Sequence, residues 1–269
     1  MTIIQAIILG LVQGLTEFIP VSSSGHLILF HQWLGVNQSV QAGFLFDMAL
    51  NIGTFTALIL YFHKDIITLI KAVFNKSAKE FRLAWLLVLA TFPAAVAGFL
   101  LKETAESTFR SSKLVACSLI VAGGIMFGAE WYAKRVKDKT KLNDVQPKQA
   151  VAIGVAQALA IIPGVSRSGA TITTGLFAGM DRVAATRFSF LLGIPIMFGA
   201  IVDTLLTKSS LGSIGNEKGV FIAGIIAAFV SGIFAIGFLL KYLAKHNLNV
   251  FAYYRVILGL VILLIAFLR

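Results

Sequence analysis

Two polar stretches decide the fold: Ile19-Pro20-Val21-Ser22-Ser23-Ser24-Gly25-His26 and Pro163-Gly164-Val165-Ser166-Arg167-Ser168-Gly169. They interrupt apolar segments that span residues 3–34 and 149–180. About 13–17 helical residues before each break reach only about 20–25 Å, which is short for a hydrocarbon core of about 30 Å. Each segment is therefore predicted to form a re-entrant helical hairpin. Backbone without helical hydrogen bonds is tolerated at that depth only where protein buries it or where it lines a cavity.

The two interrupted segments share residues at a fixed offset of 144 positions (154 minus 10). The recurring pairs are Gly10 and Gly154, Gln13 and Gln157, Val21 and Val165, Ser22 and Ser166, Ser24 and Ser168, Gly25 and Gly169, Phe44 and Phe188, and Phe46 and Phe190. A constant offset through two polar breaks indicates a duplication. We predict a single membrane domain, residues 1–269, with internal repeat halves of about 1–143 and 144–269.

The composition is that of an integral membrane protein. Of the 269 residues, 58% are hydrophobic and 13% are charged, whereas a soluble domain carries about 25% charged residues. Six further apolar runs are long enough to cross a bilayer. The predicted class is thus an all-α integral membrane fold with six transmembrane helices and two re-entrant hairpins. The six runs lie near 43–62, 83–101, 113–133, 184–206, 219–240 and 251–268.

The net charge of +11 is read as a topology signal, because no basic-aromatic nucleic-acid motif accompanies it. One set of loops holds fifteen Lys and Arg residues and the other set holds six, so the positive-inside rule places the first set in the cytoplasm. The first set comprises 63–82, 134–149, 181–187 and 241–252; the second comprises 35–42, 102–113, 207–218 and the C-terminus.

Both chain ends are consequently predicted outside the cytoplasm. Each half has three crossings, so the second half is inverted relative to the first. The first hairpin then enters from outside and the second from the cytoplasm. Inverted repeats with broken helices that meet near the midplane are typical of transporters, and helix N-termini at such breaks favour anions.

The N-terminal region lacks the positive segment of a secretory signal, so Met1 onward is read as mature protein. Cys117 is the only cysteine, which excludes an internal disulfide. The chain has no P-loop, no GxGxxG before a helix and no HExxH, which argues against nucleotide hydrolysis and zinc proteolysis. Ser24-Gly25-His26 is reminiscent of membrane acid phosphatases, but their second motif requires a histidine where this chain has Thr173.

Glu17 is the most informative residue, because a carboxylate near the bilayer centre costs about 2.5–3.5 kcal/mol on insertion scales. Gln13 lies one helical turn earlier, so both side chains share a face. Together they could bind a divalent cation through oxygen atoms, or Glu17 could act as a general base. A polar pair that holds helices together is the structural alternative.

Arg167 is the only charged residue between 149 and 180. A guanidinium beside hydroxyls and a helix N-terminus can bind phosphate oxygens in a bidentate manner. An internal ion pair between Arg167 and Glu17 is the alternative. Arg167 can have both roles if an anionic ligand opens the ion pair. The flanking hydroxyls are those of Ser166, Ser168 and Thr171.

His26 follows the serine run 22–24 at the first break. A histidine there can act as nucleophile or as proton donor, and a neighbouring serine can attack if a base is present. A merely hydrogen-bonded histidine is equally compatible with the pattern. Asp47 and Asn51, one turn apart, could line the same cavity or form structural hydrogen bonds.

The two motifs, read from Gln13 to His26 and from Pro163 to Thr171, closely resemble the signatures of the undecaprenyl-diphosphate phosphatase family, the bacitracin-resistance proteins. The resemblance covers the whole chain. It implies hydrolysis of undecaprenyl diphosphate to undecaprenyl phosphate and phosphate, which recycles the lipid carrier for peptidoglycan synthesis in the bacterial inner membrane. Many members have glutamates at both positions of the first motif, whereas this chain has Gln13 and Glu17.

The resemblance also implies a set of site residues and a cofactor, Mg²⁺ or Ca²⁺, at Glu17 and Gln13. Catalytic roles fall to Glu17, Ser23, His26 and Arg167, and substrate-binding roles to Gln13, Ser22, Ser166, Ser168 and Thr171. The choice between Ser23 and His26 as nucleophile stays open, as does the formation of a homodimer. A lipid-carrier transporter or flippase without hydrolysis is the alternative function, and phosphate release from a C55 diphosphate discriminates between the two.

Overall fold

The computed structural model describes residues 1–36, 40–75, 79–107, 111–207 and 217–268, and within these ranges the regular structure is entirely helical. Six helices are long and apolar enough to cross a membrane in the described part of the chain. The prediction of an all-α membrane protein with six spans is therefore confirmed. The six are α3 (Val40–Tyr61), α5 (Lys79–Ser107), α6 (Ser112–Ala133), α9 (Arg182–Thr207), α10 (Lys218–Lys245) and α11 (Asn249–Leu268).

The two interrupted segments form helix pairs that are broken where the polar stretches predicted. The first pair is α1 (Ile3–Phe18) and α2 (Ser23–Trp33), and the second is α7 (Pro147–Leu159) and α8 (Arg167–Phe177). The members of each pair pack against each other. That both pairs enter and leave a bilayer on one side stays a prediction, as do the duplication and its inversion.

Corresponding helices of the two predicted halves pack on helices of the opposite half. Helix α1 packs on α10, and α7 packs on α5. Glycines at equivalent positions allow both approaches: a Cβ atom added at Gly10 would lie 2.8 Å from the Ala227 Cβ, and one at Gly154 would lie 3.0 Å from the Ala90 carbonyl carbon. Small residues serve this purpose at helix interfaces in membranes.

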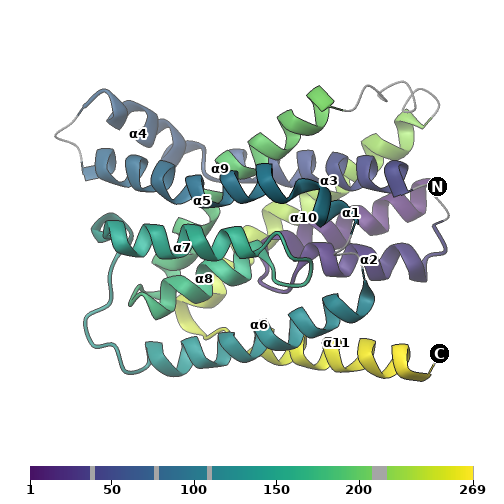
Figure 1. Cartoon of the computed structure of the whole chain (residues 1–269). Helices are drawn as coiled ribbons and strands as arrows, with labels where there is room; N and C mark the ends of the chain where they lie inside the picture. Colours follow the sequence, from purple (N-terminus) through teal and green to yellow (C-terminus); the bar gives the residue numbers. More distant parts are fainter. Residues whose placement is uncertain (37–39, 76–78, 108–110, 208–216, 269) are drawn as a thin grey trace.

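The helices run roughly along one direction, and α6 and α11 pack together along one side of the bundle (Figure 1). Both chain ends lie at one end of the molecule, and the loop between α6 and α7 lies at the other (Figure 1). The arrangement agrees with the predicted placement of both termini on the same side. Which side faces the cytoplasm stays a prediction.

Short helices are found where the sequence reading placed only loops. Helix α4 (His63–Val73) and the 3₁₀ turn η1 (Leu142–Asp144) lie within the two most basic loops. Ile67, Ile70 and Phe74 are exposed on or beside α4. An 11-residue helix is too short to register as a span, which is why a search for long apolar runs misses it.

Ion pairs tie together the loops that the charge count assigns to the cytoplasm. Arg182 and Arg187 of α9 pair with Glu130 and Asp65, respectively. Lys141 pairs with Asp181 at 2.9 Å. The buried Glu130 carboxylate also accepts the Leu248 backbone N–H at 2.8 Å, which joins α6 to the turn before α11. Loops far apart in sequence thus share one end of the bundle.

Candidate active site

The two helix breaks have the same local geometry. Ser22 and Ser166 cap the N-termini of α2 and α8, with φ angles of 77° and 70°. They are the only non-glycine residues with positive φ in the described part of the chain. Each capping hydroxyl accepts the backbone N–H three residues later, from Gly25 or Gly169. Each break therefore presents the N-terminus of a helix, where backbone donors favour an anion.

The two breaks meet at the Glu17 carboxylate. Ser23 of the first break donates its hydroxyl to Glu17 Oε2 at 2.6 Å, and Gln13 donates its amide to the same oxygen at 3.1 Å. Arg167 of the second break pairs with Glu17 Oε1 at 3.1 Å. The ion pair that the sequence offered as an alternative for Arg167 is therefore present. A single carboxylate gathers a hydroxyl, an amide and a guanidinium from α1, α2 and α8.

A cavity of about 230 Å³ opens beside this carboxylate. It contains one carboxylate, one guanidinium and hydroxyls from both breaks, with an apolar wall from α9. Its lining residues are Glu17, Ser22, Ser23, Ser24, Met48, Asn51, Ala160, Ser166, Arg167, Ile196, Met197 and Ala200. The predicted residues Glu17, Ser22, Ser23, Ser166 and Arg167 all lie on it.

The Arg167 guanidinium has donor capacity to spare. Its Nη2 contacts Glu17 and the Met197 sulfur, whereas its buried Nη1 has no hydrogen-bond partner among the described residues. The Nη1 atom lies against α9, because a Cβ added at Gly193 would approach it to 1.7 Å. Gly193 of α9 makes room for this guanidinium, because an added Cβ would lie 2.7 Å from the Arg167 Cζ atom.

Three of the predicted residues support the site from behind rather than lining the cavity. Gln13 is buried and links Glu17 to the Asn51 side chain, 3.1 Å away. Ser168 donates to the Glu17 backbone carbonyl at 3.1 Å. Thr171 donates to the Arg167 carbonyl at 2.8 Å and contacts the Ser189 hydroxyl at 2.6 Å. Their contacts fix the helices that carry Glu17 and Arg167.

His26 also lies outside the cavity lining. Its Nδ1 is 2.7 Å from the Ser22 carbonyl oxygen, and its Nε2 is 2.7 Å from the Tyr254 hydroxyl. The Tyr254 ring stacks on the imidazole at 5.6 Å between centroids. Both ring nitrogens are therefore engaged away from Glu17, so the geometry favours Ser23 over His26 as the group that faces a substrate.

Asp47 and Asn51 separate into different environments. Asp47 pairs with His31 at 2.8 Å, outside the cavity lining. Asn51 lines the cavity and accepts from Gln13.

The donor set at Glu17 fits a divalent cation only in part. Among the described residues no three His, Cys, Asp or Glu side chains are placed to hold a metal ion. Gln13 turns its amide nitrogen, rather than its oxygen, towards Glu17. Mg²⁺ often binds through one or two carboxylates together with substrate phosphates. Glu17, with the Asn51 amide oxygen and the Ser23 hydroxyl, fits a cation that a phosphate ligand helps to hold.

Sequence reasoning missed Tyr254 and Arg255, which approach the breaks from α11. Arg255 is 0% exposed, and its Nη2 donates to the Gly164 carbonyl at 2.7 Å. The signal was present, because Arg255 is the only charged residue within the apolar run 251–268. The rule on intramembrane charge that singled out Glu17 applies equally to Arg255.

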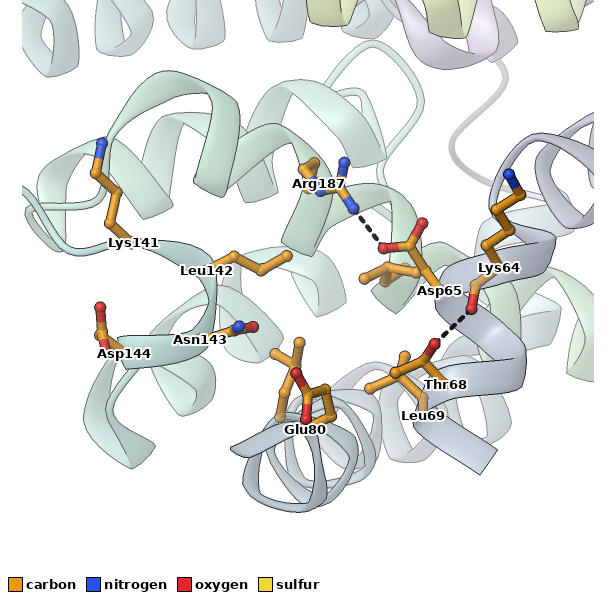
Figure 2. A pocket seen from close by; sticks show the side chains of 12 residues that line it. Lys64, Asp65, Thr68, Leu69, Glu80, Lys141, Leu142, Asn143, Asp144 and Arg187 are labelled. Atoms are coloured by element: carbon orange, nitrogen blue, oxygen red, sulfur yellow. Dashed lines mark hydrogen bonds and ion pairs between the residues drawn. The ribbon is translucent and has the colours of Figure 1, made fainter. Parts of the chain in front are cut away.

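A larger cavity, about 580 Å³, lies at the opposite end of the bundle from the chain termini, between α4, α5, η1 and α9. Figure 2 shows the Arg187–Asp65 ion pair on its wall, with Glu80 and Asp144 on other sides. Its lining contains three cations and three carboxylates, and thus no charge excess for an anion. The charged lining residues are Lys64, Lys141, Arg187, Asp65, Glu80 and Asp144. The cavity beside Glu17 is therefore the better candidate for phosphate chemistry.

Comparison with known proteins gives one consistent family. The family described as bacitracin resistance protein BacA matches residues 6–261. A protein of Desulforudis audaxviator named undecaprenyl-diphosphatase is 43% identical over 266 residues, covering 98% of both chains. Undecaprenyl-diphosphatases of Moorella thermoacetica and Pelotomaculum thermopropionicum are 43% and 42% identical, with 100% and 99% of the present chain covered. The same alignments cover 100% and 97% of the Moorella thermoacetica and Pelotomaculum thermopropionicum proteins, respectively.

Proposed function

The chain belongs to the bacitracin resistance protein BacA family, and from this membership we propose that it hydrolyses undecaprenyl diphosphate to undecaprenyl phosphate and inorganic phosphate. The relatives named above carry that enzymatic name over their full length. The activity recycles the lipid carrier of peptidoglycan synthesis and thereby confers bacitracin resistance. The site of action is the bacterial inner membrane, and a homodimer is the proposed state of assembly.

One observation carries the proposal: Glu17 joins a hydroxyl nucleophile from one break to a guanidinium from the other, beside a cavity. The Ser23 hydroxyl lies 2.6 Å from Oε2, and Arg167 Nη2 lies 3.1 Å from Oε1. A nucleophile next to a base is the arrangement that covalent catalysis requires. An anion-binding group at the same place supplies the charge stabilisation that dominates phosphoryl transfer.

In the first step, Ser23 attacks the terminal phosphorus of the diphosphate. Glu17 accepts the hydroxyl proton, a bond forms between Ser23 Oγ and phosphorus, and the bond from phosphorus to the bridging oxygen breaks. Undecaprenyl phosphate leaves with the electron pair of that bond. Arg167, which lines the same cavity, donates to a phosphate oxygen and stabilises the charge that develops there.

In the second step, water hydrolyses the phosphoserine. Glu17 has passed its proton to the leaving phosphate, so it is again a carboxylate and can accept a proton from the attacking water. The bond from Ser23 Oγ to phosphorus breaks, Glu17 passes the proton it took from water to Ser23 Oγ, and inorganic phosphate is released with the serine hydroxyl restored. The N-termini of α2 and α8 face the same anion through both steps.

A divalent cation, Mg²⁺ or Ca²⁺, would be held by Glu17 with the oxygens of Asn51 and Ser23 and by the diphosphate itself. When bound, it neutralises negative charge on the diphosphate oxygens.

The nucleophile is tested with substrate labelled at the terminal phosphorus. Purified protein is mixed with labelled undecaprenyl diphosphate, quenched in acid and separated from lipid. Phosphoserine survives acid whereas phosphohistidine does not, so acid-stable label that is absent from Ser23→Ala supports Ser23. Label that is lost in acid and absent from His26→Ala would assign the attack to His26.

Release of phosphate tests the function itself. We expect the unaltered protein to release phosphate with Mg²⁺ or Ca²⁺ present, and Ser23→Ala to release at least 100-fold less. Thr56→Val on α3, whose hydroxyl donates only to the Ile52 carbonyl, is the matched control and keeps full activity. No release by well-folded protein with either cation would favour a transporter of the lipid carrier instead.

A further inference from the structure

Arg255 connects the two helix breaks through their backbone carbonyls. Nη1 donates to the Pro20 carbonyl at 3.2 Å, and Nη2 donates to the carbonyls of Gly164 and Val165 at 2.7 and 2.9 Å. The first acceptor belongs to the break after α1 and the other two belong to the break after α7. A single guanidinium on α11 therefore fixes the distance between segments that are more than 140 residues apart in the sequence (164 minus 20).

The breaks need such a donor because their carbonyls lack helical partners. Arg255 is fully buried, and a carbonyl that water does not reach must find a donor within the protein. Ser22 and Ser166 follow within two residues and adopt positive φ. A non-glycine residue in that region costs about 1–3 kcal/mol and persists only where its surroundings hold it.

The neighbouring residue on α11 supports the first break in the same way. Tyr254 contacts His26, whose other ring nitrogen reaches the Ser22 carbonyl oxygen. The carbonyls of Pro20 and Ser22 are thus both held from α11, one directly and one through His26. Val21 lies between these two carbonyls, and Ser23 of the proposed mechanism follows them. Both residues therefore have little freedom to shift.

Burying the charge of Arg255 without a carboxylate partner destabilises the fold. The arginine is fully buried, and no carboxylate pairs with it among the described residues. An unpaired buried charge costs several kcal/mol. Only a planar five-donor group reaches carbonyls in two separate segments at once, whereas an amide or an amine cannot reproduce that fork.

We propose that Arg255 is a positioning residue that keeps the two breaks in register, so that Ser23 and Arg167 meet at the same carboxylate. The proposal rests on the hydrolysis proposed above. Without the fork, Arg167 still binds the diphosphate, but the Ser23 hydroxyl loses its alignment with the phosphorus. The expected signature is a fall in kcat of at least 100-fold with KM changed by less than 3-fold.

The experiment compares Arg255→Gln and Arg255→Lys with Arg182→Gln, a control on α9 that is outside both breaks. Arg182 also forms a buried ion pair, with Glu130, but lies in no contact with the breaks. All three variants are expected to unfold at lower temperature. Only the Arg255 variants should lose kcat at a temperature where the proteins are folded, the lysine variant at least 10-fold.

Wild-type kcat in either Arg255 variant overturns the proposal. An equal loss of kcat in Arg182→Gln overturns it as well, because the loss then reflects general destabilisation. If Arg255→Gln cannot be purified, Arg255→Lys decides, since lysine keeps the charge and one donor.

A second measurement is independent of activity. Spin labels on cysteines at Leu11 and Val155, exposed on α1 and α7, report the separation of the two segments by pulsed electron paramagnetic resonance, in a Cys117→Ala background. Arg255→Gln should shift or broaden the distance distribution, and Arg182→Gln should not. An unchanged distribution in Arg255→Gln overturns the proposal even if the protein releases no phosphate, which would count separately against the proposed function.

Discussion

The Glu17 carboxylate accepts hydrogen bonds from three side chains, one of which is charged. Oε2 receives both Ser23 and Gln13, and Oε1 receives Arg167. The side chains of Glu17 and Arg167 are only 10% and 12% exposed. A pair this buried is costly to break from one side, by about 3–5 kcal/mol, because the remaining charge is left without a partner.

Replacing Arg167 with lysine keeps the charge but removes the fork. Loss of one donor that stabilises developing charge costs about 10²–10³ in kcat, so we expect Arg167→Lys to release phosphate at least 100-fold more slowly. Cys117→Ala, on α6, is the control with unchanged activity. Equal rates for Arg167→Lys and Cys117→Ala would remove Arg167 from the site.

Gly193 provides a sharper probe of the same guanidinium. A methyl group there would lie 2.7 Å from Arg167 Cζ, whereas one at Gly199, six residues further along the same helix, meets nothing within 4 Å. Gly193→Ala should therefore lower phosphate release at least 10-fold while Gly199→Ala leaves it unchanged. Phosphate-release rates of the two purified variants check this, and full activity of Gly193→Ala would contradict the placement of the guanidinium.

At the scale of elements, the breaks were predictable and their supports were not. Pro20 ends α1 for a local reason, since proline disfavours the helical conformation in the residue before it, and α7 ends at Leu159, four residues before Pro163. The Glu17–Arg167 ion pair was anticipated because two lone charges in apolar segments need partners. The contact between His26 and Tyr254 joins residues 228 positions apart, and no local pattern indicates it. Helix α4 was missed because its polar residues resemble those of a loop.

The packing of α1 on α10 and of α7 on α5 can be tested by adding bulk. Gly10→Val and Gly154→Val place side chains where backbone already lies, and overpacking of this kind costs about 1–3 kcal/mol. We expect both variants to unfold at lower temperature in detergent. Gly124→Val, which faces open space on α6, serves as control, and a melting temperature as high as that of the control in either variant would refute the close packing.

At the scale of the whole molecule, the distribution of charge predicts the orientation. The two sets of loops hold fifteen and six Lys and Arg residues, and Arg182 and Arg187, which form ion pairs, belong to the set with fifteen. The composition predicted the membrane class of the chain, which the six long apolar helices confirm, whereas the orientation stays a prediction. The composition could not establish the larger cavity, because its walls come from four separate elements.

The predicted orientation is checked by labelling cysteines in intact cells with a membrane-impermeant maleimide, in a Cys117→Ala background. Thr2→Cys and a cysteine added after Arg269 should react from outside, because both termini are predicted there. Lys137→Cys, in the most basic loop, should react only after permeabilisation. Reaction of Lys137→Cys in intact cells, or protection of either terminus, would reverse or break the predicted topology.

The ion pair between Glu17 and Arg167 has a consequence for ligand discrimination. In the unliganded site the guanidinium is neutralised by the carboxylate 3.1 Å away, so an incoming anion must compensate for whatever part of that attraction it disrupts. Chloride or a phosphate monoester brings less negative charge than a diphosphate and compensates less. We therefore expect the site to bind a diphosphate more tightly than the monophosphate product.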